Sequence, residues 1–151
     1  MRIAIVADHN GIELKANLVA RLRGAGHEVD DRGAFSPDEV VDYPTFCVDI
    51  AGEILSGRAD RGIVVGGSGS GEAIACNKIR GIRAGIALEP FTTEISRAHN
   101  DANVLVIGAK VLDTARAGEL TDLWLRTQFK GGRHQHRLDQ IAAIERGEPP
   151  R

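Results

Sequence analysis

A glycine-rich stretch, residues 66–71 (Gly-Gly-Ser-Gly-Ser-Gly), is the part of the sequence whose residue types point most directly to chemistry. It follows residues 63–65 (Ile-Val-Val), a run typical of a buried parallel strand, and it precedes Glu72, which opens a helix-like segment. In such a strand–loop–helix unit, backbone N–H groups converge at the positive end of a helix. The stretch therefore predicts an anion-binding cradle with the carboxylate of Glu72 beside it.

The spacing of these glycines excludes the common nucleotide-binding loops. In the dinucleotide fingerprint counted from Gly67, the third glycine position holds Glu72. In the P-loop pattern, Glu72 stands where lysine is needed and Ala73 stands where the Mg²⁺-binding hydroxyl is needed. The remaining interpretation is a base that removes a carbon-bound proton while the cradle stabilises the resulting oxyanion. The alternative is a tight turn followed by a solvated glutamate.

Three further groups of polar residues could take part. Asp8 and His9 follow the first apolar run, where Asp8 could cap the next helix, although capping leaves His9 unexplained. His99 and Asn100 end a helical pattern, where a histidine can simply interact with the helix dipole. A cationic cluster near the C-terminus could clamp a phosphate or a carboxylate, or could be an exposed charged loop; it contains Arg133, His134, His136 and Arg137. Two histidines without a third ligand do not indicate a metal site.

Composition narrows the class of protein. The chain has 151 residues and a formal net charge of −2, so we expect one domain over residues 1–151 and no nucleic-acid partner. No apolar run is long enough for a membrane span, and the sequence opens directly into a strand pattern, so we expect no membrane partner, no targeting peptide and a cytoplasmic location. Cys47 and Cys76 form no C-x-x-C motif and are expected to be buried and reduced.

Apolar periodicity predicts alternating strands and helices. The strands are expected at residues 2–7, 27–31, 62–65, 84–88 and 104–107. The helices are expected at residues 12–24, 43–55, 72–78, 89–100 and 112–129, and a last helix ending near residue 146 follows a basic loop at 131–137. Residues 147–151 are expected to form a loose tail.

This alternation predicts an α/β fold of three αβα layers around a five-stranded parallel sheet, Rossmann-like or flavodoxin-like, with strand order 2-1-3-4-5. In this order ligands bind between strands one and three, at the carboxyl ends of the strands. The loops that follow these two strands carry Asp8 and His9 in one case and the glycine stretch in the other. Strand pattern and residue chemistry thus predict a site at the same edge of the sheet.

Seven motifs together carry a resemblance to a known family. In chain order they are Asp8-His9, Asp42-Tyr43-Pro44, residues 67–71, residues 75–78 (Ala-Cys-Asn-Lys), residues 81–84 (Gly-Ile-Arg-Ala), residues 96–100 (Ser-Arg-Ala-His-Asn) and residues 131–135 (Gly-Gly-Arg-His-Gln). With these motifs the sequence resembles ribose-5-phosphate isomerase type B, of the RpiB/LacAB sugar-phosphate isomerase family, nearly end to end. The resemblance implies interconversion of ribose 5-phosphate and ribulose 5-phosphate through a cis-enediolate, without metal or organic cofactor.

The resemblance also implies roles for individual residues. Many family members use as base a cysteine just before the glycine loop, but this chain has Gly66 there, so Glu72 is expected to be the base, as in members that lack the cysteine. His99 would assist opening of the sugar ring, and Ser68 would help to stabilise the enediolate. The remaining substrate-binding residues implied are Asp8 for sugar hydroxyls, Asn100 near the reacting carbons, Tyr43 at the pocket wall, the backbone of Gly67, Gly69, Ser70 and Gly71, and His9, Arg133 and Arg137 for the phosphate. Lys110 stands where the family commonly has arginine, which keeps the charge but loses the bidentate fork.

The resemblance further implies a homodimer, or a tetramer, whose active site is shared between subunits. The last helix and tail, about residues 135–151, would then pack on or near the partner. Two alternatives stay open for the activity. One is another aldose phosphate as substrate, such as allose 6-phosphate, galactose 6-phosphate or a tetrose phosphate, and the other is a phosphosugar-binding protein without catalysis, which would not need Glu72 or His99.

Overall fold

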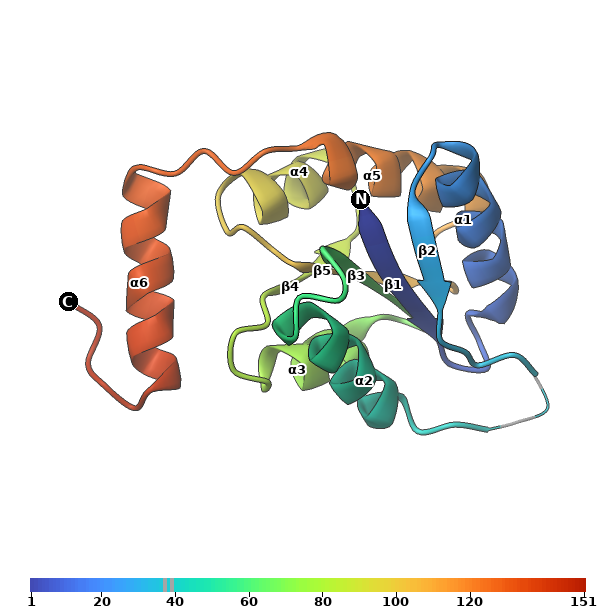
Figure 1. Cartoon of the computed structure of the whole chain (residues 1–151), viewed down its shortest axis with the longest axis horizontal. Helices are drawn as coiled ribbons and strands as arrows, with labels where there is room; N and C mark the ends of the chain where they lie inside the picture. Colours follow the sequence, from blue (N-terminus) through green and yellow to red (C-terminus); the bar gives the residue numbers. More distant parts are fainter. Residues whose placement is uncertain (37, 39) are drawn as a thin grey trace.

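The structure is a computed structural model that describes residues 1–36, 38 and 40–151. Helices cover both faces of a parallel sheet (Figure 1), which confirms the predicted three-layer α/β fold. The strands are β1 (Arg2–Ala7), β2 (Glu28–Asp31), β3 (Arg61–Gly66), β4 (Ala84–Ala87) and β5 (Val104–Gly108). The helices are α1 (Ile12–Gly24), α2 (Tyr43–Leu55), α3 (Ser70–Asn77), α4 (Pro90–Ala98), α5 (Thr114–Arg126) and α6 (Arg133–Glu145).

The strand order is β2-β1-β3-β5-β4, so the predicted order 2-1-3-4-5 was wrong at one edge. The five residues of β5, Val-Leu-Val-Ile-Gly, are all buried, whereas three of the four residues of β4, Ala-Gly-Ile-Ala, are partly exposed. A continuous apolar run suits a strand with neighbours on both sides and helices on both faces. β5 therefore lies inside the sheet, and the shorter β4 forms the edge. The neighbours β1 and β3, between which the site was predicted, are the same in both orders.

Two apolar clusters hold the layers together. α1 and α5 pack on one face of the sheet around Leu22, Leu120 and Trp124, and α2 and α3 pack on the other face around Ile50 and Cys76. The Trp124 side chain is fully buried, and its indole N–H donates to Ser96 Oγ (3.1 Å), which ties α5 to α4. This closed packing gives a rigid platform for the loops that follow the strands.

The predicted basic loop at residues 131–137 is instead the start of a helix, because α6 begins at Arg133. Gly131 and Gly132 lie between α5 and α6, and their φ angles of +61° and +57° are in the left-handed region that favours glycine. Arg133 and Arg137 are thus one turn apart and lie on one face of α6.

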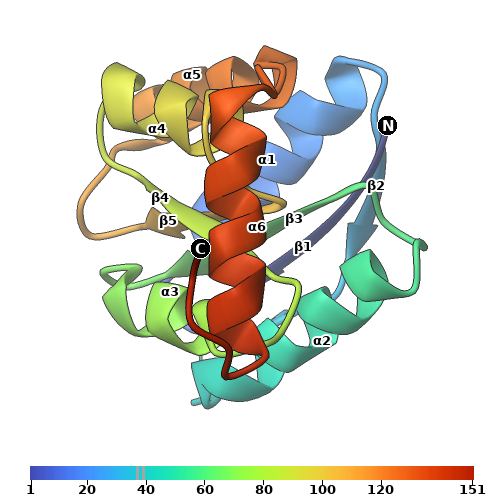
Figure 2. The same cartoon turned by 90° about the vertical axis from the view of Figure 1, so that its left-hand side faces the viewer.

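Helix α6 stands off from the three layers beyond the β4 edge (Figure 1), and in the orthogonal view it crosses in front of β4 and β5 (Figure 2). Two backbone donors connect this region to the body of the fold: Lys130 N–H donates to the Ala98 carbonyl (2.9 Å), and Gly81 N–H donates to Glu145 Oε1 (3.2 Å). Within the part of the chain that the structure describes, most side chains of α6 are exposed.

The two cysteines are buried and not bonded to each other, as predicted. The neighbouring Cys47 thiol and burial raise the pKa of the Cys76 thiol, which keeps that thiol protonated. Among the described residues, no helix is long and apolar enough to cross a membrane.

Candidate functional site

The glycine stretch forms a loop at the carboxyl edge of the sheet, between the end of β3 and the start of α3. Gly69 precedes α3 with a φ of +83°, a left-handed conformation that glycine adopts without strain. Two backbone hydrogen bonds anchor the loop to the segment after β5, because Ala109 N–H donates to the Gly66 carbonyl (2.8 Å) and Lys110 N–H donates to the Gly67 carbonyl (2.9 Å). The predicted cradle is therefore a fixed turn at a helix N-terminus, where the helix dipole favours an anion.

Glu72 lies in the first turn of α3 and is only 4% exposed. Its carboxylate folds back over the end of β3, so that a Cβ atom added to Gly66 would collide with Glu72 Oε1. Among the described residues, the carboxylate has no hydrogen-bonding or ion-pair partner. A carboxylate held close to an anion cradle and free of a counter-charge can accept a proton from a bound molecule. The alternative of a solvated surface glutamate does not fit this burial.

Because the Glu72 carboxylate fills the place of a side chain at residue 66, substitution Gly66→Ala is expected to displace it. We expect kcat of the isomerase reaction implied by the resemblance to fall about 10²-fold, since a shift of about 1 Å in a reacting group can cost that much. Gly52→Ala in α2 is the matched control, because a Cβ there would have no atom of the described residues within 4 Å. Steady-state kinetics of both variants test this, and wild-type kcat in Gly66→Ala would contradict the packing of Glu72.

The loop after β1 lies directly against the cradle. Asp8 N–H donates to the Val65 carbonyl (3.0 Å), and the Asp8 side chain is 7% exposed. Asp8 is not the N-cap of α1, because that position is held by Gly11. Its carboxylate instead accepts hydrogen bonds from the backbone and side chain of Asn10 (2.8 and 3.2 Å). Asn10 is a site residue that the sequence analysis did not identify, although it follows Asp8 and His9 in the same polar loop.

Tyr43 and Lys110 complete the surroundings of the cradle. The Tyr43 ring at the start of α2 lies so close to Gly71 that an added Cβ would be 2.6 Å from its Cζ and OH atoms. Lys110 is exposed, and its backbone is bonded to the loop. Ser68 Oγ accepts from Ser70 N–H (3.2 Å), so its own proton is available to a ligand. The structure thus brings together one set of predicted site residues, which we call the cradle cluster: Asp8, His9, Tyr43, Gly67, Ser68, Gly69, Ser70, Gly71, Glu72 and Lys110.

The other predicted site residues gather at a different place. His99 ends α4, and its ring stacks on that of His134 in the first turn of α6, with centroids 3.8 Å apart and planes inclined by 15°. Arg133 and Arg137 are on the same helix, with exposed side chains, and Asn100 is the residue after His99. We call this set the histidine–arginine cluster; it contains His99, Asn100, Arg133, His134 and Arg137.

The two clusters lie at opposite ends of strand β5: the histidine–arginine cluster near its amino end and the cradle cluster near its carboxyl end. His99 precedes β5 and Lys110 follows it, and the five residues of β5 span about 16 Å at about 3.3 Å per residue. One chain therefore does not bring Glu72 and His99 to the same small molecule. A site that uses both clusters needs the histidine–arginine cluster of a second copy.

The stacked pair gives a prediction for the pH dependence of stability. The pKa of His134 lies below its ordinary value of 6.5, because the ring is desolvated and because cationic groups surround it, namely His99, Arg133, Arg137 and Lys130. The folded state therefore binds this proton less tightly than the unfolded state, and stability is lost as the pH falls below about 6.5. We expect the melting temperature of His134→Phe to fall less than that of the wild type when the pH is lowered from 7.5 to 5.5, as measured by calorimetry at fixed protein concentration. His136→Phe, on the exposed side of the same helix turn, serves as the control, and equal pH dependence in His134→Phe and the wild type would refute the assignment.

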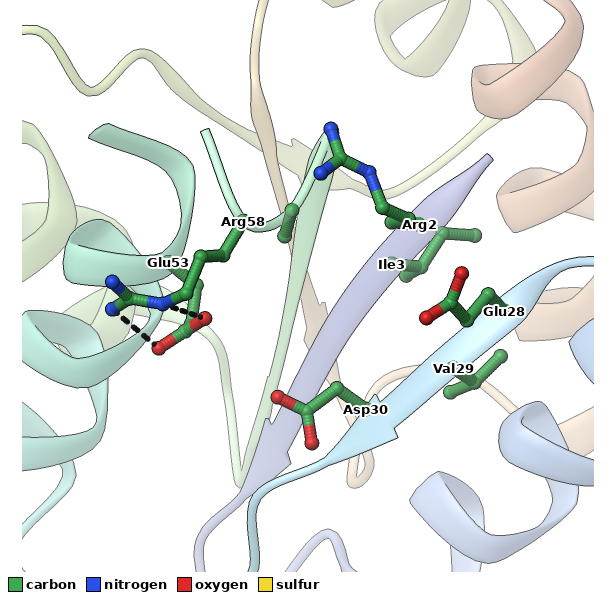
Figure 3. A pocket seen from close by; sticks show the side chains of 8 residues that line it. Arg2, Ile3, Glu28, Val29, Asp30, Glu53 and Arg58 are labelled. Carbon is green, nitrogen blue, oxygen red and sulfur yellow. Dashed lines mark hydrogen bonds and ion pairs between the residues drawn. The ribbon is translucent and has the colours of Figure 1, made fainter. Parts of the chain in front are cut away.

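A charged hollow elsewhere does not compete with the cradle. It has a volume of about 370 Å³ and lies at the amino ends of β1 and β2 (Figure 3). Its two arginines are already neutralised, since Arg58 pairs with Glu53 (2.9 Å) and Arg2 pairs with Asp60 (2.6 Å). The lining also holds the carboxylates of Glu28, Asp30 and Glu53 against these two arginines, so it has no excess of positive charge for an anionic ligand. Within the described ranges, no three His, Cys, Asp or Glu side chains are grouped as metal ligands.

Fold and site together define a class of protein: a three-layer α/β protein that places a buried carboxylate beside an anion cradle at the switch between β1 and β3. Comparison with known proteins identifies the family. The family model described as Ribose/Galactose Isomerase matches residues 3–141, and the chain belongs to this family.

Relatives of known sequence and structure agree over nearly the whole chain. The chain is 44% identical to ribose-5-phosphate isomerase B of Escherichia coli over 144 residues, which cover 95% of this chain and 96% of that protein. The solved structure of ribose-5-phosphate isomerase B from Clostridium thermocellum superimposes with a TM-score of 0.95 at 41% identity, covering 97% of this chain and 99% of the other. A structure of the Mycoplasma genitalium enzyme with bound ribulose-5-phosphate gives a TM-score of 0.91 at 32% identity, with 96% of each chain covered.

Proposed function

We propose that this chain is an aldose–ketose isomerase that interconverts ribose 5-phosphate and ribulose 5-phosphate. The observation that carries the proposal is the Glu72 carboxylate, buried in the space next to Gly66 and beside the cradle. Similarity to ribose-5-phosphate isomerase B over nearly the full length of both chains supports the choice of substrate. A phosphosugar-binding protein without catalysis would have no need for a buried, unpaired carboxylate at this place.

In the proposed reaction Glu72 moves one proton between adjacent carbons of the open-chain sugar. Its carboxylate takes the proton from C2 of the aldose, and the electron pair passes to the carbonyl oxygen to form a cis-enediolate. The backbone N–H groups of residues 67–71 and the Ser68 hydroxyl stabilise this oxygen anion. The proton of the C2 hydroxyl passes to the oxygen on C1, and the C2 oxygen becomes the carbonyl as protonated Glu72 returns its proton to C1, which yields the ketose and restores the carboxylate. No net charge or proton is gained or lost by the enzyme.

Asp8 and the residues around it would orient the sugar for this transfer. The Asp8 carboxylate can accept hydrogen bonds from the hydroxyls near C1 and C2, and its position is set by Asn10. The Tyr43 ring packed against Gly71 forms the wall of the pocket. His99 and Asn100 of a second copy would assist ring opening and hold the reacting carbons. Holding the substrate in one geometry supplies much of the rate acceleration.

Cationic groups from both clusters would bind the phosphate. Lys110 adjoins the cradle, while Arg133 and Arg137 present two guanidinium groups on one face of α6. His9, next to Asp8, would add a hydrogen-bond donor to the phosphate. The phosphate is remote from the reacting carbons, so its binding energy can position the sugar for proton transfer.

We further propose a homodimer, the minimal assembly that joins the two clusters into shared active sites. The face of α6 that turns toward β4 supports this proposal, because a hollow of about 400 Å³ between them is lined in part by Ile82, Ile141 and Ile144. Ile141 and Ile144 are 42% and 60% exposed in the single chain, which is unfavourable for apolar side chains in water. The last helix and tail would cover a partner rather than their own chain.

The test of the proposed function is a panel assay of the purified protein with aldose phosphates of four, five and six carbons. We expect the highest kcat/KM with ribose 5-phosphate. A higher value with a four- or six-carbon sugar would move the assignment to another isomerase of the same chemistry. Tight binding of sugar phosphates without turnover would overturn the enzymatic proposal. The two reduced, buried cysteines are in keeping with an enzyme of the cytoplasm, where we propose it acts.

A further inference from the structure

Asn10 bridges two residues of the cradle cluster that differ in chemistry. Its side-chain nitrogen Nδ2 lies 3.2 Å from Asp8 Oδ2 and 3.1 Å from His9 Nε2. Its backbone N–H donates to the other oxygen of Asp8 (2.8 Å), and a Cβ added to Gly67 would be 3.5 Å from the same Nδ2. The amide therefore sits between the carboxylate, the imidazole and the cradle.

The protonation of the His9 ring follows from these contacts. An ionised carboxylate only accepts hydrogen bonds, so the atom of Asn10 that faces Asp8 must be the NH₂ group and not the oxygen. The same NH₂ group then faces Nε2 of His9, and an amide nitrogen only donates. Nε2 must accept, so the ring is neutral and carries its proton on Nδ1.

The Nδ1 atom of His9 is buried and has no hydrogen-bonding partner in the part of the chain that the structure describes. A buried donor without an acceptor is rare in native proteins and points to a ligand or to a functional role. Asn10 borders Gly67 of the cradle, whose carbonyl accepts from Lys110 N–H, so the ligand chemistry that fits a neutral N–H donor in this cluster is an oxyanion such as phosphate.

We propose that Asn10 is a positioning residue that fixes His9 in the Nδ1–H tautomer, so that this nitrogen donates to the phosphate of the substrate, and that holds Asp8 in place through the same amide. The tautomer rests only on the geometry of this chain. The phosphate contact rests on the proposed function.

The tautomer is measured by NMR on the ¹⁵N-labelled, full-length protein without substrate. The chain has five histidines, and the spectrum of His9→Gln identifies the signals of His9. Long-range ¹H–¹⁵N correlations distinguish a protonated from an unprotonated ring nitrogen. We expect the wild type to show Nδ1–H for His9, and we expect Asn10→Ala to shift His9 toward the Nε2–H form. Asn17→Ala is the matched control, because within the described residues the Asn17 side chain bonds only to a carbonyl of its own helix, and the change is expected to leave His9 unchanged.

The consequence for binding is measured with inorganic phosphate as the probe, by its inhibition constant against the isomerase and by calorimetry without any turnover. Loss of one hydrogen bond to a charged group is expected to weaken phosphate binding about tenfold in Asn10→Ala. The Nε2–H form of His9 in the wild type, or an unchanged tautomer in Asn10→Ala, would overturn the role of Asn10. A shifted tautomer with wild-type phosphate affinity would overturn the phosphate contact. If the panel assay found no isomerase activity, the NMR and calorimetric results would still decide both points.

Discussion

Glutamine in place of Glu72 is expected to abolish most of the isomerase activity while leaving substrate binding nearly intact. The amide has the shape of the carboxylate and fits the same space beside Gly66, but it accepts no proton from carbon. Loss of a general base typically costs about 10²- to 10⁴-fold in rate, and the three atoms nearest to a Cβ built on Gly66 all belong to the Glu72 carboxylate. We therefore expect kcat to fall about 10⁴-fold, the larger of these losses, with KM changed by much less.

The Glu72→Gln prediction is measured by steady-state kinetics together with calorimetric titration of the variant with ribose 5-phosphate. Glu119→Gln, an exposed change on α5, is the control for the effect of removing one negative charge. Turnover of Glu72→Gln within a few fold of the wild type would show that another group is the base. Loss of binding as well as turnover would mean that Glu72 acts on substrate affinity and not on proton transfer.

The second large effect is expected when two defective subunits are combined in one dimer. If the active site is shared, a heterodimer of Glu72→Gln and the double variant Arg133→Ala/Arg137→Ala has one site with both defects and one site with none. Each parent homodimer carries a defect in both sites. We therefore expect the purified heterodimer to regain about half of the wild-type kcat per dimer, since twofold symmetry makes the two sites equivalent.

The heterodimer is isolated by co-expression with two different affinity tags and is assayed with ribose 5-phosphate. The control pairs Glu72→Gln with Gly66→Ala, which both impair the Glu72 carboxylate. This pair leaves one defect in each site and is expected to restore nothing. Restoration in this control, or none in the first pair, would contradict a site assembled from the two clusters. Elution as a monomer in size-exclusion chromatography would contradict the proposed dimer itself.

Several features of the molecule could be predicted from local sequence patterns. The buried run of residues 62–65, the glycine loop and the first turn of α3 follow from residue types alone, because each feature depends on neighbours in the chain. The placement of Asp8 against this loop followed from the rule that ligands bind at the carboxyl ends of neighbouring parallel strands. The prediction failed for the order of β4 and β5, although the fully apolar β5 carried the signal that it lies inside the sheet.

Other features depend on contacts that no local pattern describes. The basic residues 133–137 looked like a loop because glycines precede them and charged residues fill them, yet the glycines only end one connection before α6 begins. The fit of Glu72 into the space at Gly66 depends on how α3 packs against the end of β3, and the bridge made by Asn10 depends on side-chain orientations within one loop. The separation of His99 from Glu72 by the length of β5 likewise depends on β5 being the neighbour of β3 in the sheet.

The most direct test of the central claim is a crystal structure of the protein with ribulose 5-phosphate bound. We expect the Glu72 carboxylate about 3–3.5 Å from C1 and C2 of the sugar, which is the range required for transfer. We also expect the phosphate between Lys110 of one subunit and Arg133 and Arg137 of the other. A sugar bound away from the cradle, or a Glu72 side chain turned to solvent while the sugar occupies the site, would contradict the account.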